Sequence, residues 1–232
     1  MTPLAAPTTV ENNCLTRNDW ICGLYYSSRA DELTQALLQH VGIVVVSVLL
    51  GLVVAFPLAL LARRYRRLEG LVVGCTTAIY TIPSLALFSL LVPLTGLGVE
   101  TVVIGLGLYS LTILVRGMLD GFRGVPAEVR ESATGMGYGA GRMLFRVELP
   151  LALPTIMGSL RVATVSTVAL TTVGAILDEG GLGDLLVDGQ LSDFKAEVLA
   201  TSVLCVLLAV ALDLVLVAAQ RVMTPWTRRR TA

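Results

Sequence analysis

Five long apolar segments constrain the fold of this chain more than any other feature of its sequence. They cover residues 37–62, 71–92, 99–122, 151–177 and 198–220. A helix needs about 20 apolar residues to cross the hydrocarbon layer, where no water satisfies backbone N–H and C=O groups. Hydrophobic residues make up 55% of the chain and charged residues 15%, an apolar excess that soluble domains do not use. The sequence therefore predicts an all-α integral membrane protein with about five transmembrane helices.

Positive charges flank these segments unevenly, and their distribution predicts the orientation in the membrane. Arginines follow the first, third and fifth segments, at Arg63, Arg64, Arg66, Arg67, Arg123, Arg130, Arg142, Arg146, Arg221 and Arg228 to Arg230. The other side holds only Arg17, Arg29 and Lys195. Because positive residues are retained on the cytoplasmic side, we expect the N-terminus outside and the C-terminus inside.

This orientation divides the chain into three parts. Residues 1–32 form an extracellular N-terminal tail, residues 33–220 the transmembrane domain and residues 221–232 a basic cytoplasmic tail. The N-terminal tail contains Cys14 and Cys22, the one pair of cysteines in a polar segment, where a disulfide can form. Two unpaired thiols remain the alternative, since spacing alone establishes neither the geometry nor the redox compartment.

The connection between the third and fourth apolar segments, residues 123–150, has the features of a folded unit. Pro126 suits the first position of a helix, which Gly135 and Gly137 would end after about two turns. A second short amphipathic helix is expected at residues 142–148, with a glycine permitting close approach of the two. The pair would form a compact knob on the cytoplasmic side, of a kind that fits a groove on a soluble partner.

At these residues the chain resembles the permeases of bacterial ABC importers, whose signature is Glu-Ala-Ala, three residues, Gly, nine residues and Ile-x-Leu-Pro. The chain has Glu131-Ser132-Ala133, then Gly137, then Val147-Glu148-Leu149-Pro150, so that every spacing is met. Serine replaces one alanine, and valine replaces the isoleucine. In that family the segment docks on the ATP-hydrolysing subunit, so the resemblance implies a type I ABC importer permease fold. It also implies a coupling role for Glu131, Ser132, Ala133, Gly137, Leu149 and Pro150.

The competing interpretation of this connection is an ordinary cytoplasmic loop that matches by chance. Fixed spacings in the expected place between two spans favour the coupling segment. The glycines of residues 135–141 superficially suggest a phosphate-binding loop, but no strand is expected before them and no Lys-Ser/Thr ending follows. We therefore expect a non-catalytic subunit that binds no cofactor or metal itself, with ATP-Mg held by a partner ATPase.

Polar residues on the fourth apolar segment are candidates for the translocation path. Arg161, Thr164, Thr167 and Thr171 recur at spacings of three, three and four, which places them on one helical face. A charge in lipid costs at least about 2.5 kcal/mol, so Arg161 is expected to face protein, water or headgroups. The alternative is structural: the threonines bond to their own helix and Arg161 extends to an interface. Asp213 in the fifth segment has the same two interpretations.

Two further groups are candidates for the path and its outer gate. Tyr80, Pro83 and Ser84 lie where a proline can kink the second segment, and we place them on the path. Glycines in the loop at residues 178–184 form a candidate outer gate, with a solvated turn as the alternative. These glycines are Gly180, Gly181 and Gly183. His40, the single histidine, is expected to be structural.

The resemblance extends beyond the coupling segment and suggests the solute. Residues 78–88, 147–154 and 180–184 are similar to permeases of the osmoprotectant branch, which import glycine betaine, carnitine, choline or proline. The resemblance implies a multi-pass protein of the bacterial cell membrane. It also implies a second permease, identical or paralogous, two copies of an ATP-binding subunit and an extracellular solute-binding protein. Membrane lipid is the remaining partner, and no nucleic acid is expected.

Three other functions compete with this interpretation. A permease of a methionine-type amino-acid importer belongs to the same class, and the solute retained by the binding protein would distinguish it. An ion-driven secondary transporter or channel would need no ATPase, but no repeat of broken helices is evident in the sequence. An intramembrane hydrolase needs a metal or nucleophile constellation, and one histidine leaves little to build it from.

Overall fold

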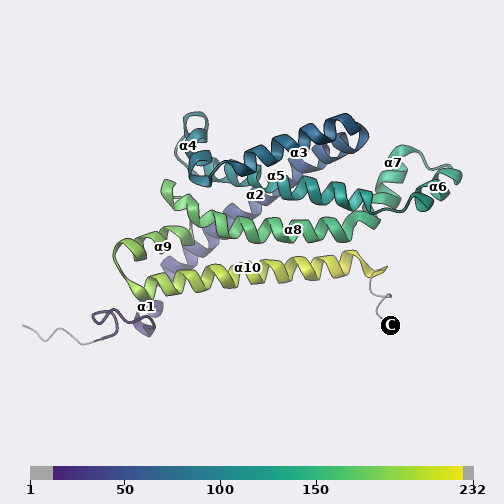
Figure 1. Ribbon diagram of the computed structural model, residues 1–232. Helices are drawn as coiled ribbons and strands as arrows, with labels where there is room; N and C mark the ends of the chain where they lie inside the picture. Colours follow the sequence, from purple (N-terminus) through teal and green to yellow (C-terminus); the bar gives the residue numbers. More distant parts are fainter. Residues whose placement is uncertain (1–12, 227–232) are drawn as a thin grey trace, which may run out of the picture.

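Four long apolar helices form the frame of the computed structural model, which describes residues 13–226. Figure 1 shows them side by side in an elongated bundle. Their bounds are Ala30–Arg64, Val99–Arg123, Ala140–Leu177 and Lys195–Met223. The first of them, α2 (Ala30–Arg64), has acidic residues in its first turn and arginines in its last, an arrangement that favours the helix dipole at both ends.

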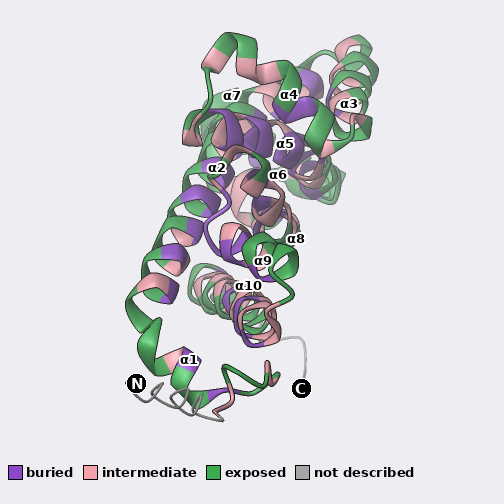
Figure 2. Cartoon of the chain, turned by 90° about the vertical axis from the view of Figure 1, so that its left-hand side faces the viewer, coloured by how far each residue is buried: buried purple, intermediate pink, exposed green. Residues whose placement is uncertain are grey.

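The third apolar segment forms α5 (Val99–Arg123), the most buried of the four long helices. It packs between α2 and α8 (Leu149–Thr171), and Figure 2 shows its buried positions inside the bundle. The backbones approach closely: a Cβ atom on Gly51 of α2 would lie 1.8 Å from Ser110 Oγ of α5. Close packing of small residues holds helices together in lipid, where apolar side chains gain little by leaving the solvent.

The second apolar segment, residues 71–92, is broken at the proline where a kink was predicted. The chain forms α3 (Arg66–Thr81) and α4 (Ser84–Thr95), which are bent by 101° relative to each other. Pro83 explains the break, because it has no N–H to continue the helix and holds Ile82 in an extended conformation. The two helices add a fifth crossing only if the bent pair is one span.

The connection after α5 begins with α6 (Ala127–Gly135), the first of the two predicted short helices. The second is not a separate element. Instead α7 (Ala140–Met143) and a π-helical segment (Leu144–Glu148) run directly into α8. Pro150 therefore lies at a change of helix type instead of starting a new helix. Proline has no N–H to donate, and the N–H of the preceding Leu149 donates to the Leu144 carbonyl in the π-helical pattern.

At the opposite end of the bundle, α8 gives way to a 3-10 turn (Thr172–Leu177). The chain then returns through α9 (Leu182–Leu191) into α10 (Lys195–Met223). The short helix α1 (Gly23–Ser28) lies beside the start of α10 in Figure 1.

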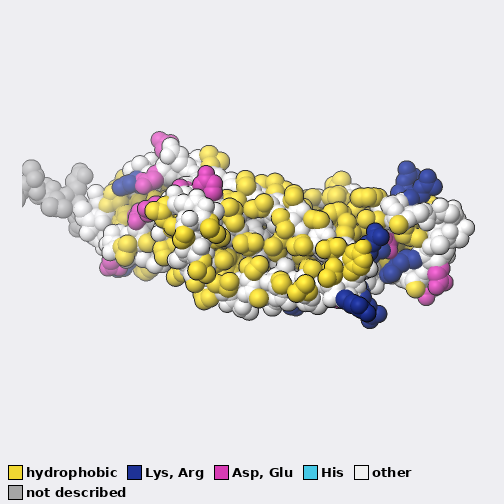
Figure 3. Space-filling view, turned by 90° about the horizontal axis from the view of Figure 1, so that it is seen from above, with side chains coloured by type: hydrophobic (Ala, Val, Ile, Leu, Met, Phe, Trp, Pro, Cys, Tyr) yellow, Lys and Arg dark blue, Asp and Glu magenta, His cyan; other side chains and the backbone are white. Residues whose placement is uncertain are grey.

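Charged side chains gather mostly at the two ends of the bundle, and the surface between them is hydrophobic (Figure 3). We call one the basic end, with Arg63, Arg64, Arg66, Arg142 and Arg146, and the other the acidic end, with Asp178, Glu179, Asp184 and Asp188. Such a distribution suits a bilayer-spanning protein with the predicted charge asymmetry. The predicted tails lie partly outside the described residues, since residues 1–12 and 227–232, with Arg228 to Arg230, are not among them.

Candidate functional site

The coupling segment projects from the basic end of the bundle, where α6 and α7 lie in Figure 1. Ala133 is buried, with 2% of its surface exposed, and faces the bundle. The other predicted coupling residues are exposed on the knob or half-buried at the start of α8; they are Glu131, Ser132 and Gly137, then Leu149 and Pro150. The segment therefore offers a surface to a partner instead of forming one compact site.

Gly137 ends α6 in a left-handed conformation, with φ of +81°. Its N–H donates to the carbonyl of Thr134 at 2.9 Å, and the N–H of Tyr138 donates to the carbonyl of Ala133 at 3.1 Å. This pair of bonds is the Schellman arrangement, in which glycine is favoured because other residues are strained at positive φ. A Cβ at Gly137 would meet no atom within 4 Å, so close helix approach is not what requires the glycine.

A buried ion pair ties the coupling segment to the bundle. Glu148, at the end of the π-helical segment, has only 2% of its side chain exposed, and its Oε1 accepts a hydrogen bond from Arg63 at the end of α2. Arg130 Nε of α6 lies 3.7 Å from the same oxygen. Arg130 Nη2 also donates to the Val125 carbonyl at 2.6 Å. We call Arg63, Arg130 and Glu148 the Glu148 cluster; it joins α2, α6 and α8.

Apolar side chains are exposed on the same knob. Met136 is 69% exposed, Phe145 61% and Val129 36%. Exposed apolar residues beside charged ones, at the water-facing end of a membrane protein, are typical of a protein interface. This surface fits the docking role that the resemblance implies for the segment.

Arg161 of α8 forms an ion pair with Asp213 of α10. Its Nε and Nη2 lie 2.7 and 2.8 Å from the two carboxylate oxygens, a two-point geometry that planar guanidinium groups favour. Arg161 and Asp213, for which the sequence left the same two interpretations open, are therefore partners of each other. The pairing neutralises both charges within the apolar part of the bundle.

The three threonines of the predicted path, Thr164, Thr167 and Thr171, are buried on the same helix. Each hydroxyl donates to the carbonyl four residues earlier, at 2.9, 2.8 and 2.8 Å. These hydrogen bonds within one helix are the ones expected if the threonines have a structural role. Their place on the translocation path stays a prediction.

Tyr80, Pro83 and Ser84 lie together at the corner between α3 and α4. The Tyr80 ring packs edge-to-face on Tyr109 of α5, with centroids 5.7 Å apart. The Tyr109 hydroxyl donates to the carbonyl of Ile82, which the break in the helix leaves without its usual partner. The predicted path residues thus form two groups, one at this corner and one along α8.

The glycines of the predicted outer gate are packed tightly. A Cβ on Gly181, which has φ of +58°, would lie 2.8 Å from the backbone N of His40, and one on Gly183 would lie 2.5 Å from Thr172. His40 is fully buried, with its ring nitrogens 3.1 Å from the carbonyl oxygens of Gly180 and Val168. The glycines therefore permit close backbone packing of the loop against α2, and a gating role remains a prediction.

Asp184 closes the same loop at the acidic end. Its Oδ1 accepts a hydrogen bond from the Gly180 N–H at 2.8 Å. Burial raises the pKa of the Asp184 carboxyl above its usual value, and the charges of Asp178 and Glu179 add to the shift. Backbone N–H groups oppose it without cancelling it.

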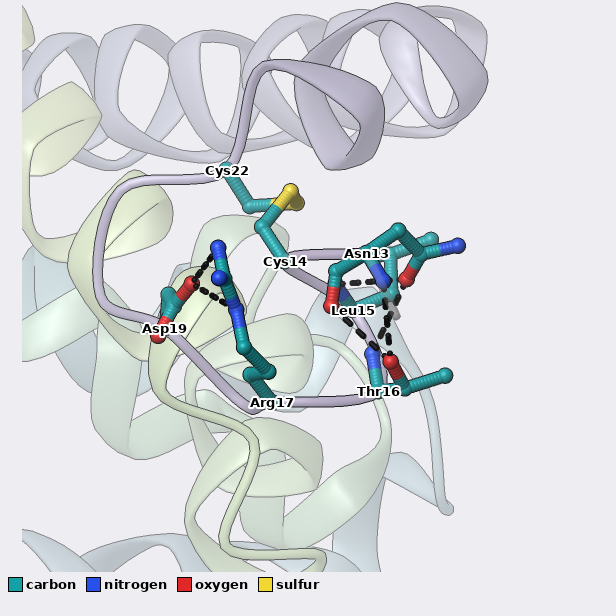
Figure 4. A network of polar contacts seen from close by, with 7 residues as sticks. All are labelled: Asn13, Cys14, Leu15, Thr16, Arg17, Asp19 and Cys22. Atoms are coloured by element: carbon teal, nitrogen blue, oxygen red, sulfur yellow. Dashed lines mark hydrogen bonds and ion pairs between the residues drawn. A yellow bond between two sulfur atoms is a disulfide. The ribbon is translucent and has the colours of Figure 1, made fainter. Parts of the chain in front are cut away.

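The structure joins Cys14 and Cys22 by a disulfide, with the Cα atoms 5.4 Å apart (Figure 4). Asn13 caps the turn between them, because its Oδ1 accepts hydrogen bonds from the backbone N–H groups of Leu15 and Thr16. Asn18 then donates to the carbonyl of Asp193 at 2.6 Å, in the connection between α9 and α10. The crosslinked tail is thereby fastened to the acidic end.

Sequence reasoning missed the Glu148 cluster and the contact of Tyr109 with Ile82. A lone carboxylate between Val147 and Leu149, at the border of an apolar segment, was the available signal for the cluster. No sequence signal pointed to the contact of Tyr109, because its partner, the Ile82 carbonyl, is freed by the break between two other helices. Within residues 13–226, no group of three or more His, Cys, Asp and Glu side chains could hold a metal ion.

Comparison with known proteins identifies the family. Residues 47–229 match the family model of the binding-protein-dependent transport system inner membrane component. The chain is 37% identical over 209 residues to the glycine betaine/carnitine/choline transport system permease protein OpuCD of Bacillus subtilis, covering 90% of this chain and 91% of that protein. It is 36% identical over 207 residues to the osmoprotectant import permease protein OsmW of Salmonella typhimurium, covering 87% and 96%.

A solved structure shows the same fold. An inward-facing form of the MetNI methionine ABC transporter matches with a TM-score of 0.75 at 19% identity, covering 85% of this chain and 98% of that one. Membership thus rests on the family model and the relatives, and the structural match adds the type I importer permease fold. The chain belongs to the family of binding-protein-dependent transport system inner membrane components.

Proposed function

We propose that this chain is the permease subunit of an ATP-driven importer of osmoprotectants such as glycine betaine, carnitine, choline or proline. The names of the relatives support this class of solute. The observation that carries the proposal is the exposed coupling segment at the basic end, with its signature spacing and its Schellman turn at Gly137. The basic end is then cytoplasmic, where a soluble ATPase can reach it.

The Glu148 cluster supplies a route by which a movement of α6 would reach the membrane. Arg130 and Glu148 link α6 to the end of α2 and the start of α8. The helical run from Ala140 to Leu177 continues for 38 residues. A shift of its cytoplasmic end would therefore be transmitted along the helix to the other side of the membrane.

The partners follow from this role. Two copies of an ATP-binding subunit would hold ATP-Mg and hydrolyse it, while this chain performs no catalysis. A second permease, identical or paralogous, would complete the path, and a solute-binding protein would deliver the solute at the acidic end. The exposed apolar surface of α10 is available to lipid or to the second permease.

Uptake by a reconstituted complex tests the function. Liposomes that contain this chain, its ATPase and its binding protein are expected to accumulate glycine betaine only when ATP reaches the ATPase. Accumulation of methionine in its place would indicate the methionine-type importer. Uptake of glycine betaine that persists without ATP would contradict the proposal and indicate an ion-driven transporter.

A further inference from the structure

We propose that Arg116 of α5 and Thr77 of α3 form a binding site for the carboxylate of the transported solute. The inference rests on the proposed function and deepens it, because it names the chemical group that is recognised inside the membrane. Glycine betaine, carnitine and proline carry a carboxylate, whereas choline does not. The site would therefore distinguish among the solutes of this class.

Two arginines, Arg116 and Arg161, lie within the five apolar segments, and they differ in their partners. Arg161 is neutralised by Asp213, as described above. Arg116 is exposed and forms an ion pair with no carboxylate among the residues that the structure describes. It lies seven residues before Arg123, the end of α5, which is about 10 Å along the helix. Because an unpaired charge is costly in lipid, Arg116 must face water or an anionic group from outside this chain.

Thr77 holds the Arg116 guanidinium in a defined position. The threonine hydroxyl donates to the carbonyl of Val73 at 2.6 Å and accepts a hydrogen bond from Arg116 Nη2 at 2.8 Å. One guanidinium N–H is used in this way, and a guanidinium has five. The remaining donors are suited to a carboxylate, which arginine binds through two parallel hydrogen bonds.

A cavity of about 610 Å³ opens beside this pair, between α3 and α5, which lie along each other in Figure 1. Its size is within the range of small-molecule sites. Gly70 and Gly74 help to line it, and a Cβ on either would meet no atom within 4 Å. The absence of side chains at these positions leaves room for a solute.

The other charges of the cavity are paired with one another. Glu69 and Asp120 both form ion pairs with Arg123, nearer the basic end. The two carboxylates are therefore engaged by an arginine other than Arg116. Arg116 is left as the unpaired charge that can attract an anionic group into the cavity.

An exposed aromatic side chain lies about one helical turn beyond Thr77 on α3, outside the lining of the cavity. Tyr80 is three residues beyond Thr77, about 4.5 Å further along α3, and is 44% exposed. Aromatic rings attract quaternary ammonium groups through cation–π interactions. A zwitterion whose carboxylate binds Arg116 can thus place its ammonium group toward Tyr80. The site fits solutes that carry both groups.

Glycine betaine uptake by the reconstituted complex tests the site. Arg116→Gln is expected to lower uptake by at least about tenfold, because the charge-assisted hydrogen bonds to the carboxylate are lost. Arg116→Lys should recover part of the uptake rate, since lysine keeps the positive charge but lacks the planar guanidinium group that donates two parallel hydrogen bonds. Gly74→Leu should lower uptake by filling the cavity. Arg67→Gln is the control, because Arg67 is an exposed arginine on α3, the helix of Thr77, and does not line the cavity.

Support requires that Arg116→Gln still assembles with the ATPase and keeps the ATP hydrolysis that the loaded binding protein stimulates, while glycine betaine uptake falls. The ratio of choline to glycine betaine uptake should rise, since the variant no longer repels the choline cation. Unchanged glycine betaine uptake would overturn the site. So would a parallel loss of assembly and uptake, which would assign Arg116 to a contact with the second permease. A wild-type complex that transports no glycine betaine would instead refute the proposed function itself.

Discussion

The carboxylate of Glu148 and the guanidinium of Arg63 form an ion pair that joins the start of α8 to the end of α2, 85 residues away in the sequence. The Glu148 side chain is buried, and its second oxygen has no hydrogen-bond partner among the described residues. A buried carboxylate is costly unless it is paired, so the contact with Arg63 determines how the coupling segment is held.

Removing the Glu148 carboxylate should destabilise the basic end. Glu148→Ala leaves Arg63 and Arg130 without their shared partner, and we expect a loss of about 2 kcal/mol in the free energy of unfolding. Thermal denaturation of the purified complex measures this loss. Glu128→Ala, at an exposed position of α6, is the control and should leave the melting temperature unchanged. Equal melting temperatures for all three proteins would show that the cluster is not a structural tie.

Gly137 and Gly135 provide a matched pair for the coupling turn. Both positions have open space for a Cβ, but only Gly137 has a positive φ. Gly137→Ala should therefore strain the turn by about 1 kcal/mol, whereas Gly135→Ala should not. We expect Gly137→Ala to lower the amount of solute transported per ATP hydrolysed, with normal insertion into the membrane. The same transport ratio in both variants would contradict the role of the turn.

The pairing of Arg161 with Asp213 predicts that their charges can be exchanged. Arg161→Asp places two carboxylates side by side within the apolar bundle and should sharply lower the yield of folded protein. Combining it with Asp213→Arg restores an ion pair and should recover most of that yield, as measured by size-exclusion chromatography. A double variant that folds but does not transport would support the predicted place of Arg161 on the translocation path. A double variant as poorly folded as the single one would contradict the exchangeable pair.

The raised pKa of the Asp184 carboxyl predicts that the stability of the acidic end depends on pH. Its folded-state pKa is raised above the ordinary value of 3.8, so ionisation is disfavoured in the folded protein. The stability contributed by this group is greatest below that value and falls as the pH rises through the folded-state pKa. Asp184→Asn keeps the acceptor for the Gly180 N–H but removes the charge.

We therefore expect Asp184→Asn to flatten the loss of thermal stability of the complex as the pH rises from about 4 toward neutrality. Asp188→Asn, which removes an exposed carboxylate from the same helix, should leave that dependence as it is in the wild type. Identical pH profiles for Asp184→Asn and the wild type would contradict the assignment.

Those parts of the fold that depend on local sequence were predictable. The lengths of the apolar segments predicted the helices now seen as α2, α5, α8 and α10, because a lipid environment leaves a helix as the main way to satisfy the backbone. The signature at residues 131–150 was recognisable because it is contained in a short stretch of chain. The fusion of the second predicted short helix with α8 was not, since Pro150 could equally start a helix or lie within one.

Features that depend on contacts between distant residues could not be predicted. A proline such as Pro83 can kink a helix or break it, and here Tyr109 of another helix satisfies the carbonyl that the break frees. The ion-pair partner of Glu148 is Arg63 and that of Arg161 is Asp213, and each partner lies on a different helix, so local sequence does not identify it. The glycines near Gly181 suggested an outer gate, but the close packing of Gly181 against His40 becomes evident only when α2 is placed beside the loop.

Isolation of the tagged chain from its native membrane in mild detergent tests the central claim most directly, namely that residues 131–150 couple this permease to an ATPase. The wild-type chain is expected to be recovered with an ATP-hydrolysing subunit. Glu131→Gln and Gly137→Ala should lower the recovery of that subunit or its stimulation by the loaded binding protein. Recovery of the chain alone, together with solute uptake that is independent of ATP, would contradict the coupling role of residues 131–150.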